Sequence, residues 1–163
     1  MTAVHLRTAT EEDLPFLTDA LLLAYDWTGA ERFSREELLA DPNAAHYVVG
    51  WPAPGEFGVL AEDPATGVPV GAAWARLLPA DDPGYGYVAP DVPELTLGVV
   101  PDWRGRGVGK ALLDALLAAA VEHGHRRISL SVEDGNRAVE LYRSRGFTPV
   151  GRVGGADTML REL

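Results

Sequence analysis

The sequence contains no cysteine among its 163 residues, which excludes a disulfide framework, a thiolate nucleophile and a zinc–thiolate cluster. Long hydrophobic runs are also missing, and no stretch approaches the length of a membrane span. The first eight residues lack the charged-then-apolar pattern of a secretion signal. These absences predict a cytoplasmic protein with no membrane partner. No metal is expected, because His123 and His125 have no third ligand beside them.

Basic residues are scarce, with 14 Lys and Arg against 24 Asp and Glu, for a net charge of −10. No basic stripe with interleaved aromatic residues is present, so no nucleic-acid partner is expected. The imbalance lies in one half of the chain. Residues 1–98 hold 16 acidic and 4 basic side chains, whereas residues 99–163 hold 8 and 10. The second half therefore suits an anionic ligand, and the acidic half either attracts a cationic acceptor or simply keeps the chain soluble.

At this length the chain is large enough to bury a hydrophobic core without disulfides or a metal to stabilise it, and we expect residues 1–163 to form a single domain. Hydrophobic periodicity and turn residues predict the element order β-α-α-β-β-β-α-β-α-β-β, an α/β fold in which a mixed sheet carries helices on both faces. Strands are expected at 5–7, 58–62, 70–77, 94–100, 128–132, near Val150 and at 157–161. Helices are expected at 11–24, from Ser34 to before Asp41, at 107–123 and at 137–145. A small extended piece is expected at 46–49 and an exposed loop at 78–93.

The most informative segment is 99–113, with the sequence VVPDWRGRGVGKALL. A strand rich in β-branched residues precedes it, and a long apolar helix follows. Glycines at the start of a helix let a ligand approach the backbone closely, and the first helical turn has unpaired N–H groups at the positive end of the dipole. Basic side chains add charge, so the segment predicts a site for a pyrophosphate. The loop residues are Arg104, Gly105, Arg106, Gly107, Val108, Gly109 and Lys110.

Two common phosphate loops do not fit this segment. A Walker A loop ending at Gly109-Lys110 needs glycine where Arg104 stands and a hydroxyl where Ala111 stands. A dinucleotide fingerprint that starts at Gly105 lacks its third glycine. ATP, GTP and NAD are therefore disfavoured as ligands.

The pattern Arg104-x-x-Gly107-x-Gly109 does fit the Arg/Gln-x-x-Gly-x-Gly/Ala signature, and here the chain resembles the GNAT superfamily of acetyl-CoA-dependent N-acetyltransferases. The segment 5–14 resembles the opening strand and first helix of that family, and 136–147 resembles its C-terminal helix with the following turn. The resemblance covers nearly all of the chain. It implies a GNAT-like fold with a mostly antiparallel central sheet, acetyl-CoA as co-substrate without a metal, and a homodimer, since dimers are common in the family.

The resemblance also implies which residues hold coenzyme A. The glycine-rich loop would hold the pyrophosphate, and the backbone of the preceding strand would pair with the pantetheine arm. The implied binding residues are Leu97, Gly98, Val99, Val100, Arg104, Gly105, Arg106, Gly107, Val108, Gly109, Lys110, Asn136 and Tyr142. The side chain of Asn136 has an alternative role, because an asparagine at the start of a helix also serves as its cap.

Acetyl transfer to an amine requires a proton acceptor, donors for the oxyanion and a donor for the sulfur. Family likeness suggests Glu94 as the base acting through water, and partial burial would raise its pKa; the alternative is a solvated carboxylate at a strand end. Gly98 predicts a bulge, or else a position where a neighbouring side chain packs closely. The resemblance implies that the Val99 N–H meets the acetyl carbonyl. It also implies that Tyr142 donates to the departing thiolate, and the alternative is an ordinary core residue.

The segment 25–33 lies between the first two helices, where this fold usually shapes the acceptor site. Four of its residues are candidates for enclosing an ammonium group by charge and ring face: Asp26, Trp27, Glu31 and Phe33. The alternative is a solvated loop with two packed aromatic rings.

These residues together predict direct acetyl transfer to a primary amine of a small molecule or a peptide. Two other functions stay open. One is acetylation of a protein N-terminus or lysine, and the other is a coenzyme A-binding sensor without catalysis, which would need only the phosphate loop.

Overall fold

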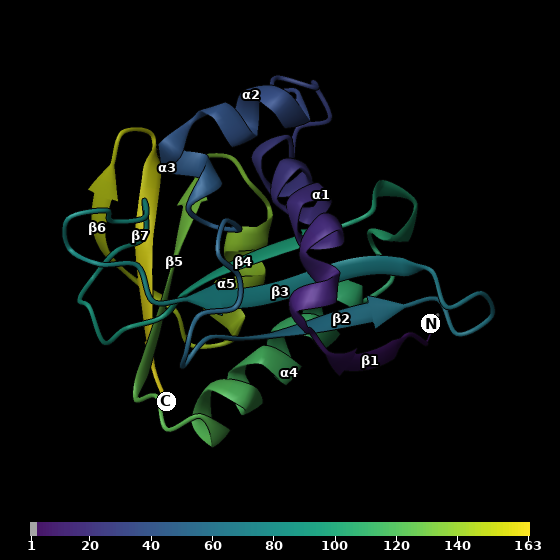
Figure 1. Ribbon diagram of the computed structural model, residues 1–163. Helices are drawn as coiled ribbons and strands as arrows, with labels where there is room; N and C mark the ends of the chain where they lie inside the picture. The colour runs from purple at the N-terminus through teal and green to yellow at the C-terminus, as the bar shows by residue number, and fades with distance from the viewer. Residues whose placement is uncertain (1–2) are drawn as a thin grey trace.

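The computed structural model describes residues 3–163. Seven strands form one sheet in the order β1-β2-β3-β4-β5-β7-β6 (Figure 1). Neighbouring strands are antiparallel except β4 and β5, which are parallel. The predicted mixed, mostly antiparallel sheet is therefore confirmed. The strands are β1 (His5–Thr8), β2 (Phe57–Glu62), β3 (Pro69–Arg76), β4 (Glu94–Val99), β5 (Arg127–Glu133), β6 (Thr148–Val153) and β7 (Ala156–Glu162).

Helices cover both faces of this sheet, as predicted (Figure 1). α1, α2 and α3 pack on one face, and α4 and α5 pack on the other. None of the helices within residues 3–163 has both the length and the apolar character needed to cross a membrane. The helices are α1 (Leu14–Tyr25), α2 (Arg35–Ala40), α3 (Pro42–Ala45), α4 (Val108–Glu122) and α5 (Ala138–Ser144), with short 3-10 turns at Glu11–Asp13 and Pro101–Trp103.

The central strands supply a hydrophobic core on each face. Along β3, Ala73 enters the core under α4, whereas Trp74 enters the core under α1. Val59 and Leu60 of β2 alternate in the same way. Successive side chains of a strand point to opposite faces. A strand buried on both faces is therefore apolar at nearly every position.

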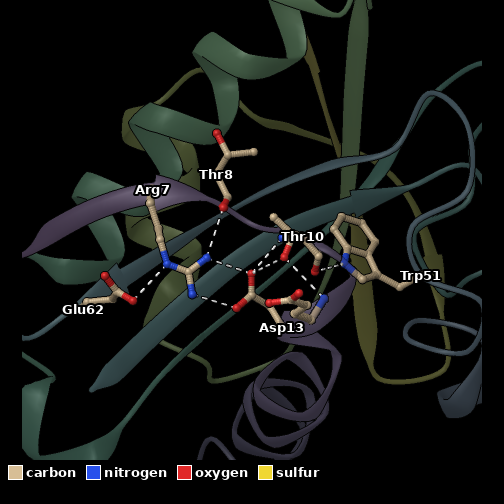
Figure 2. A network of polar contacts seen from close by, with 7 residues as sticks. Arg7, Thr8, Thr10, Asp13, Trp51 and Glu62 are labelled. Atoms are coloured by element: carbon tan, nitrogen blue, oxygen red, sulfur yellow. Dashed lines mark hydrogen bonds and ion pairs between the residues drawn. The ribbon is translucent and has the colours of Figure 1, made fainter. Parts of the chain in front are cut away.

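Figure 2 shows the polar network that ties the first strand to the first helix. The Arg7 guanidinium donates to both Asp13 oxygens at 2.7 and 2.9 Å and to Glu62 of β2 at 2.9 Å. The pairing with Arg7 lowers the pKa of Asp13. The Thr10 backbone N–H donates to Asp13 at 2.7 Å, and the Thr10 hydroxyl accepts from the Glu12 N–H at 3.3 Å. Thr10 is thus the helix cap that the sequence predicts.

Two local predictions are wrong. Residues 46–49 are not extended but continue the turns of α3, where the Val49 N–H donates to the Ala45 carbonyl at 2.9 Å. The sequence Asp41-Pro42 ends α2, but it also starts α3, because Asp41 caps that helix and proline fits its first turn. The second wrong prediction is that the loop 78–93 is exposed. It is exposed only in part, since Gly84 and Gly86 are buried.

The predicted bulge at Gly98 is also absent. The pairing of β3 with β4 runs in continuous register from Arg76↔Glu94 to Gly71↔Val99. The glycine instead lets the backbone of α1 approach β4, because a Cβ at position 98 would lie 2.3 Å from the Ala20 carbonyl oxygen. Close packing is therefore the reason for this glycine, although the neighbour is the backbone of α1 and not a side chain.

The contact between α1 and β4 generates a stability prediction. Gly98→Ala should lower the free energy of unfolding by roughly 1–3 kcal/mol or more, because the added methyl overlaps helix backbone that must shift. Gly151→Ala is the matched control, since a Cβ there meets nothing within 4 Å. Urea unfolding of both variants measures the difference. Equal stabilities would contradict the close approach of α1 to β4.

Candidate active site

The parallel strands β4 and β5 pair only where they begin. Their one register pair is Glu94↔Ser129, and the Ser129 N–H donates to the Pro93 carbonyl at 2.9 Å. Beyond this point the strands diverge toward their carboxyl ends. A cavity of about 1260 Å³ is lined by both strands, the start of α4, α5 and the segment after α1. The divergence therefore opens a passage between the two faces of the sheet.

The Val99 N–H points into this passage even though no bulge is present. The Val100 N–H donates to the Val70 carbonyl of β3 at 2.8 Å. Because the backbone groups of successive strand residues face opposite sides, the Val99 N–H faces β5. The described part of β5 has no register pair with Val99. The Val99 carbonyl accepts from Arg104 Nε at 3.1 Å, which holds the loop that follows.

The glycine-rich loop presents the uncapped start of α4 to the cavity. Gly105 and Gly107 have φ angles of +74° and +83°, a left-handed conformation that favours glycine. Gly107 occupies the cap position, where no side chain satisfies the first N–H groups of the helix. The cavity lining includes most of the predicted coenzyme residues: Leu97, Gly98, Val99, Arg104, Gly105, Gly107, Val108, Gly109, Lys110, Asn136 and Tyr142.

Two predicted coenzyme residues lie outside the lining, namely Val100 and Arg106. The Arg106 guanidinium instead packs over the Trp103 ring, 4.9 Å from its centroid, a cation–π contact that occupies this charge. Within the glycine-rich loop and the start of α4, the positive charge at the cavity wall therefore comes from Arg104 and Lys110.

Glu94 is a buried carboxylate in the cavity wall, with 4 % of its surface exposed. It is not a solvated strand-end residue. Burial raises its pKa to about 7, against the lowering effect of hydrogen bonds from the Tyr47 hydroxyl and the Gly86 N–H. Its Oε2 accepts both bonds, at 2.6 and 3.1 Å. Its Oε1 has no hydrogen-bond partner among the described residues. A carboxyl group with this pKa exchanges protons readily near neutral pH.

α5 places two further predicted residues at the cavity. Tyr142 packs edge-on against Phe147, with ring centroids 5.9 Å apart, and burial raises the pKa of its hydroxyl. Asn136 precedes the helix, and its Oδ1 accepts from the Ala138 N–H at 3.0 Å. This bond closes the turn that precedes α5, while the cap residue of the helix is Arg137, which makes no side-chain cap hydrogen bond.

The segment after α1 differs from the predicted ammonium enclosure. Trp27 and Phe33 line the cavity, but Asp26 and Glu31 do not. Asp26 accepts from the Arg32 N–H at 2.8 Å. The Arg32 guanidinium lies over the Phe33 ring, 5.4 Å from its centroid. This cation–π contact already occupies the ring face that the sequence predicts to hold an ammonium group.

Sequence reasoning missed several residues of the cavity wall. Arg32 forms an ion pair with Glu133 at the end of β5, 3.1 Å long, which links the segment after α1 to the sheet. Tyr25 and Tyr47 also line the cavity. The buried Tyr25 hydroxyl and Trp27 Nε1 have no hydrogen-bond partner within residues 3–163. Buried donors without a hydrogen-bond partner are costly. The Tyr25 hydroxyl and the Trp27 indole N–H therefore suit hydrogen bonds to a ligand in the cavity. Ion pairing across 101 residues has no local sequence signal.

Comparisons with known proteins agree with this geometry. Residues 16–147 match the acetyltransferase (GNAT) family. A mycothiol acetyltransferase of Propionibacterium freudenreichii subsp. shermanii is 38% identical over 94 residues, which cover 57% of this chain and 28% of that protein. The chain thus matches little more than a quarter of the length of that relative.

Solved structures share the whole fold. A ribosomal-protein-alanine N-acetyltransferase from Brucella melitensis is 27% identical, with a TM-score of 0.67 over 98% of this chain and 99% of that one. A GNAT superfamily phosphinothricin acetyltransferase from Sinorhizobium meliloti, solved in complex with AcCoA, has a TM-score of 0.71 at 22% identity over 100% and 89%. Among the described residues, no group of three or more His, Asp or Glu side chains is placed to hold a metal ion.

The raised pKa of Glu94 predicts how stability depends on pH. The unfolded carboxyl has a pKa of 4.5, whereas the native one has a pKa of about 7. Between these values the native state retains a proton that the unfolded state has released, so the free energy of unfolding falls as pH rises and levels off above 7. Glu94→Gln should remove this loss, a relative gain of about 3 kcal/mol between pH 4 and pH 8.

Urea unfolding of the wild type and Glu94→Gln across this pH range measures the effect. Glu140→Gln, at an exposed glutamate of α5, serves as the control for removing one carboxylate. Parallel stability curves for the wild type and Glu94→Gln would show that burial does not shift the pKa of Glu94.

Proposed function

The chain belongs to the GNAT family of acetyl-CoA-dependent acetyltransferases, and we propose that residues 1–163 act as a single domain that acetylates the primary amine of a small molecule. One observation carries the proposal. A single cavity joins the buried carboxylate of Glu94, the Val99 N–H and the uncapped start of α4. These are the groups that amine deprotonation, carbonyl polarisation and pyrophosphate binding require.

The described residues fit coenzyme A. The first N–H groups of α4 and the side chains of Arg104 and Lys110 would hold the pyrophosphate. The strand edge at Leu97 and Val99, which β5 leaves unpaired, would hydrogen-bond the pantetheine arm as an added strand does. Bound in this way, coenzyme A supplies the acetyl thioester.

Three residues would then carry the transfer. Glu94 accepts the proton of the attacking amine, through water, as the new C–N bond forms. The Val99 N–H donates to the carbonyl oxygen while negative charge develops there. The Tyr142 hydroxyl donates to the sulfur as the C–S bond breaks and the thiolate leaves. Its raised pKa favours a hydrogen bond over complete proton transfer at the start of this step.

The acceptor end favours a small amine over a polypeptide. The Arg32–Glu133 ion pair spans from the segment after α1 to β5, which narrows the entrance that an extended peptide would need. Arg32 is paired with Glu133 and with Asp26, which leaves the Glu94 carboxylate in the cavity wall to attract a cationic acceptor. The matched relatives named mycothiol acetyltransferase also act, by their name, on a small molecule.

A thiol-release assay tests the function. Acetyl-CoA with a panel of small primary amines should yield free coenzyme A, with the rate rising through about pH 7 as Glu94 ionises. Peptides with free N-termini or lysines form the second arm. Faster turnover of peptides would show that the acceptor is a polypeptide and not a small molecule. Tight coenzyme binding by calorimetry without turnover of any amine would instead favour a sensor.

Tyr142→Phe tests the leaving-group assignment. Loss of the donor should reduce kcat by about 10- to 100-fold, the range of one hydrogen bond to a charged group. The affinity for acetyl-CoA should change little, because the ring and its packing remain. Steady-state kinetics and calorimetry measure the two quantities. Unchanged kcat would remove Tyr142 from the reaction.

A further inference from the structure

We propose that Tyr47 is a positioning residue that orients the Glu94 carboxylate, holding Oε2 so that Oε1 receives the proton of the acceptor amine. The proposal rests on the role of Glu94 as the base. Tyr47 lies in the turns that follow α3, 47 residues before Glu94 in the chain. The proton of the amine reaches the carboxylate through water, whereas Tyr47 acts through the carboxylate.

The hydrogen bonds around Tyr47 fix the direction of its proton. Its hydroxyl accepts from the Tyr85 N–H at 2.8 Å and donates to Glu94 Oε2 at 2.6 Å. A hydroxyl has one proton to donate, so the amide on its oxygen leaves that proton for the carboxylate. Burial and the neighbouring Glu94 raise the pKa of Tyr47, which keeps it protonated while Glu94 titrates. Tyr47 is therefore a permanent donor.

The two oxygens of Glu94 have different surroundings. Oε2 accepts from Tyr47 and from the Gly86 N–H, whereas the buried Oε1 has no partner within the described chain. An ionised carboxylate with an unpaired buried oxygen needs a donor from a ligand or from water. The backbone of Gly84 closes over the pair, since a Cβ at that position would lie 2.0 Å from Oε1 and 2.7 Å from the Tyr47 oxygen.

Both partners of the carboxylate are anchored independently of it. The Trp74 Nε1 donates to the Tyr47 carbonyl at 2.8 Å, which fixes the backbone of that turn to β3. The Ser129 hydroxyl donates to the Gly86 carbonyl at 2.7 Å, which fixes the loop to β5. Preorganised donors hold a group in one orientation without cost at the moment of reaction.

Other ionisable groups around Glu94 do not replace Tyr47. On β3, Arg76 stands opposite Glu94 in register, but its guanidinium donates to Glu56 at 2.9 Å and to the His46 carbonyl at 3.1 Å. From α1, the Tyr25 hydroxyl makes no hydrogen bond to any described residue.

The loops and β5 add no competing charge at the carboxylate. The His46 ring pairs with Asp82, 2.9 Å from Nδ1 to Oδ1, and Tyr85 contributes its backbone N–H. On β5, Ser129 has no charge.

Tyr47→Phe tests the positioning role. Loss of the donor destabilises the ionised carboxylate, so the acid limb of kcat/KM against pH should move upward by about one unit. At pH 7 kcat should fall by roughly fivefold and recover above pH 8, with acetyl-CoA affinity unchanged. Tyr87→Phe is the matched control, because it removes a tyrosine hydroxyl from the loop 78–93, which covers Glu94, without a bond to Glu94 and should keep the wild-type limb.

Two further measurements make the result decisive. The carboxyl carbon of Glu94, followed by NMR, should titrate at higher pH in Tyr47→Phe than in the wild type, whether or not an acceptor is known. If Tyr47→Phe does not fold, replacement of Tyr47 by 3-fluorotyrosine supplies a more acidic hydroxyl of nearly the same shape and should move the limb downward.

The outcomes separate the two proposals. If Glu94→Gln abolishes the acid limb but Tyr47→Phe leaves both the limb and the NMR titration unchanged, Glu94 is the base and the positioning role is wrong. If Glu94→Gln retains the wild-type limb and rate, the base assignment is wrong and the role of Tyr47 ends with it. A shifted limb together with a shifted carboxyl titration supports both.

Discussion

The single pairing between β4 and β5 at Glu94 and Ser129 is the constraint on which the site depends. Had the two strands stayed paired, the Val99 N–H would bond to β5 and the sheet would have no passage. Because they separate, the strand edge, the start of α4 and α5 all border the same cavity. The pair also places Glu94 at the closed end of the gap, where the loop 78–93 covers it.

Burial and hydrogen bonding oppose each other at Glu94. Removal from water disfavours the charged form, while Tyr47 and Gly86 favour it, and the balance leaves the pKa at about 7. Burial alone would keep the carboxyl protonated at higher pH, and donors alone would make it a weak base. The glycines at 84 and 86 allow this environment, since side chains there would overlap the carboxylate or the backbone of β5.

Local patterns predicted the phosphate loop and two helix starts correctly, but not residues 46–49, which continue the turns of α3 and are not extended. Glycine spacing predicted the loop at 105–107, and the cap signals at Thr10 and Ser34 predicted the starts of their helices. The other errors of the sequence predictions concern contacts between segments that are distant along the chain. Gly98 is a glycine because α1 crosses it, Arg32 takes the place of a ligand over Phe33, and Tyr47 reaches Glu94 across 47 residues. No periodicity or spacing encodes such pairs, because they exist only once the sheet has assembled.

The proposed sites for the two reactants lie toward opposite faces of the sheet. The glycine-rich loop starts the helix on one face, whereas Tyr47 and the segment after α1 belong to the other. In the proposed reaction the two reactants would therefore approach from opposite faces, and both could be bound at once. Direct transfer in one step requires acetyl-CoA and the amine to be bound at the same time. A mechanism that stored the acyl group on a side chain would need only one entrance.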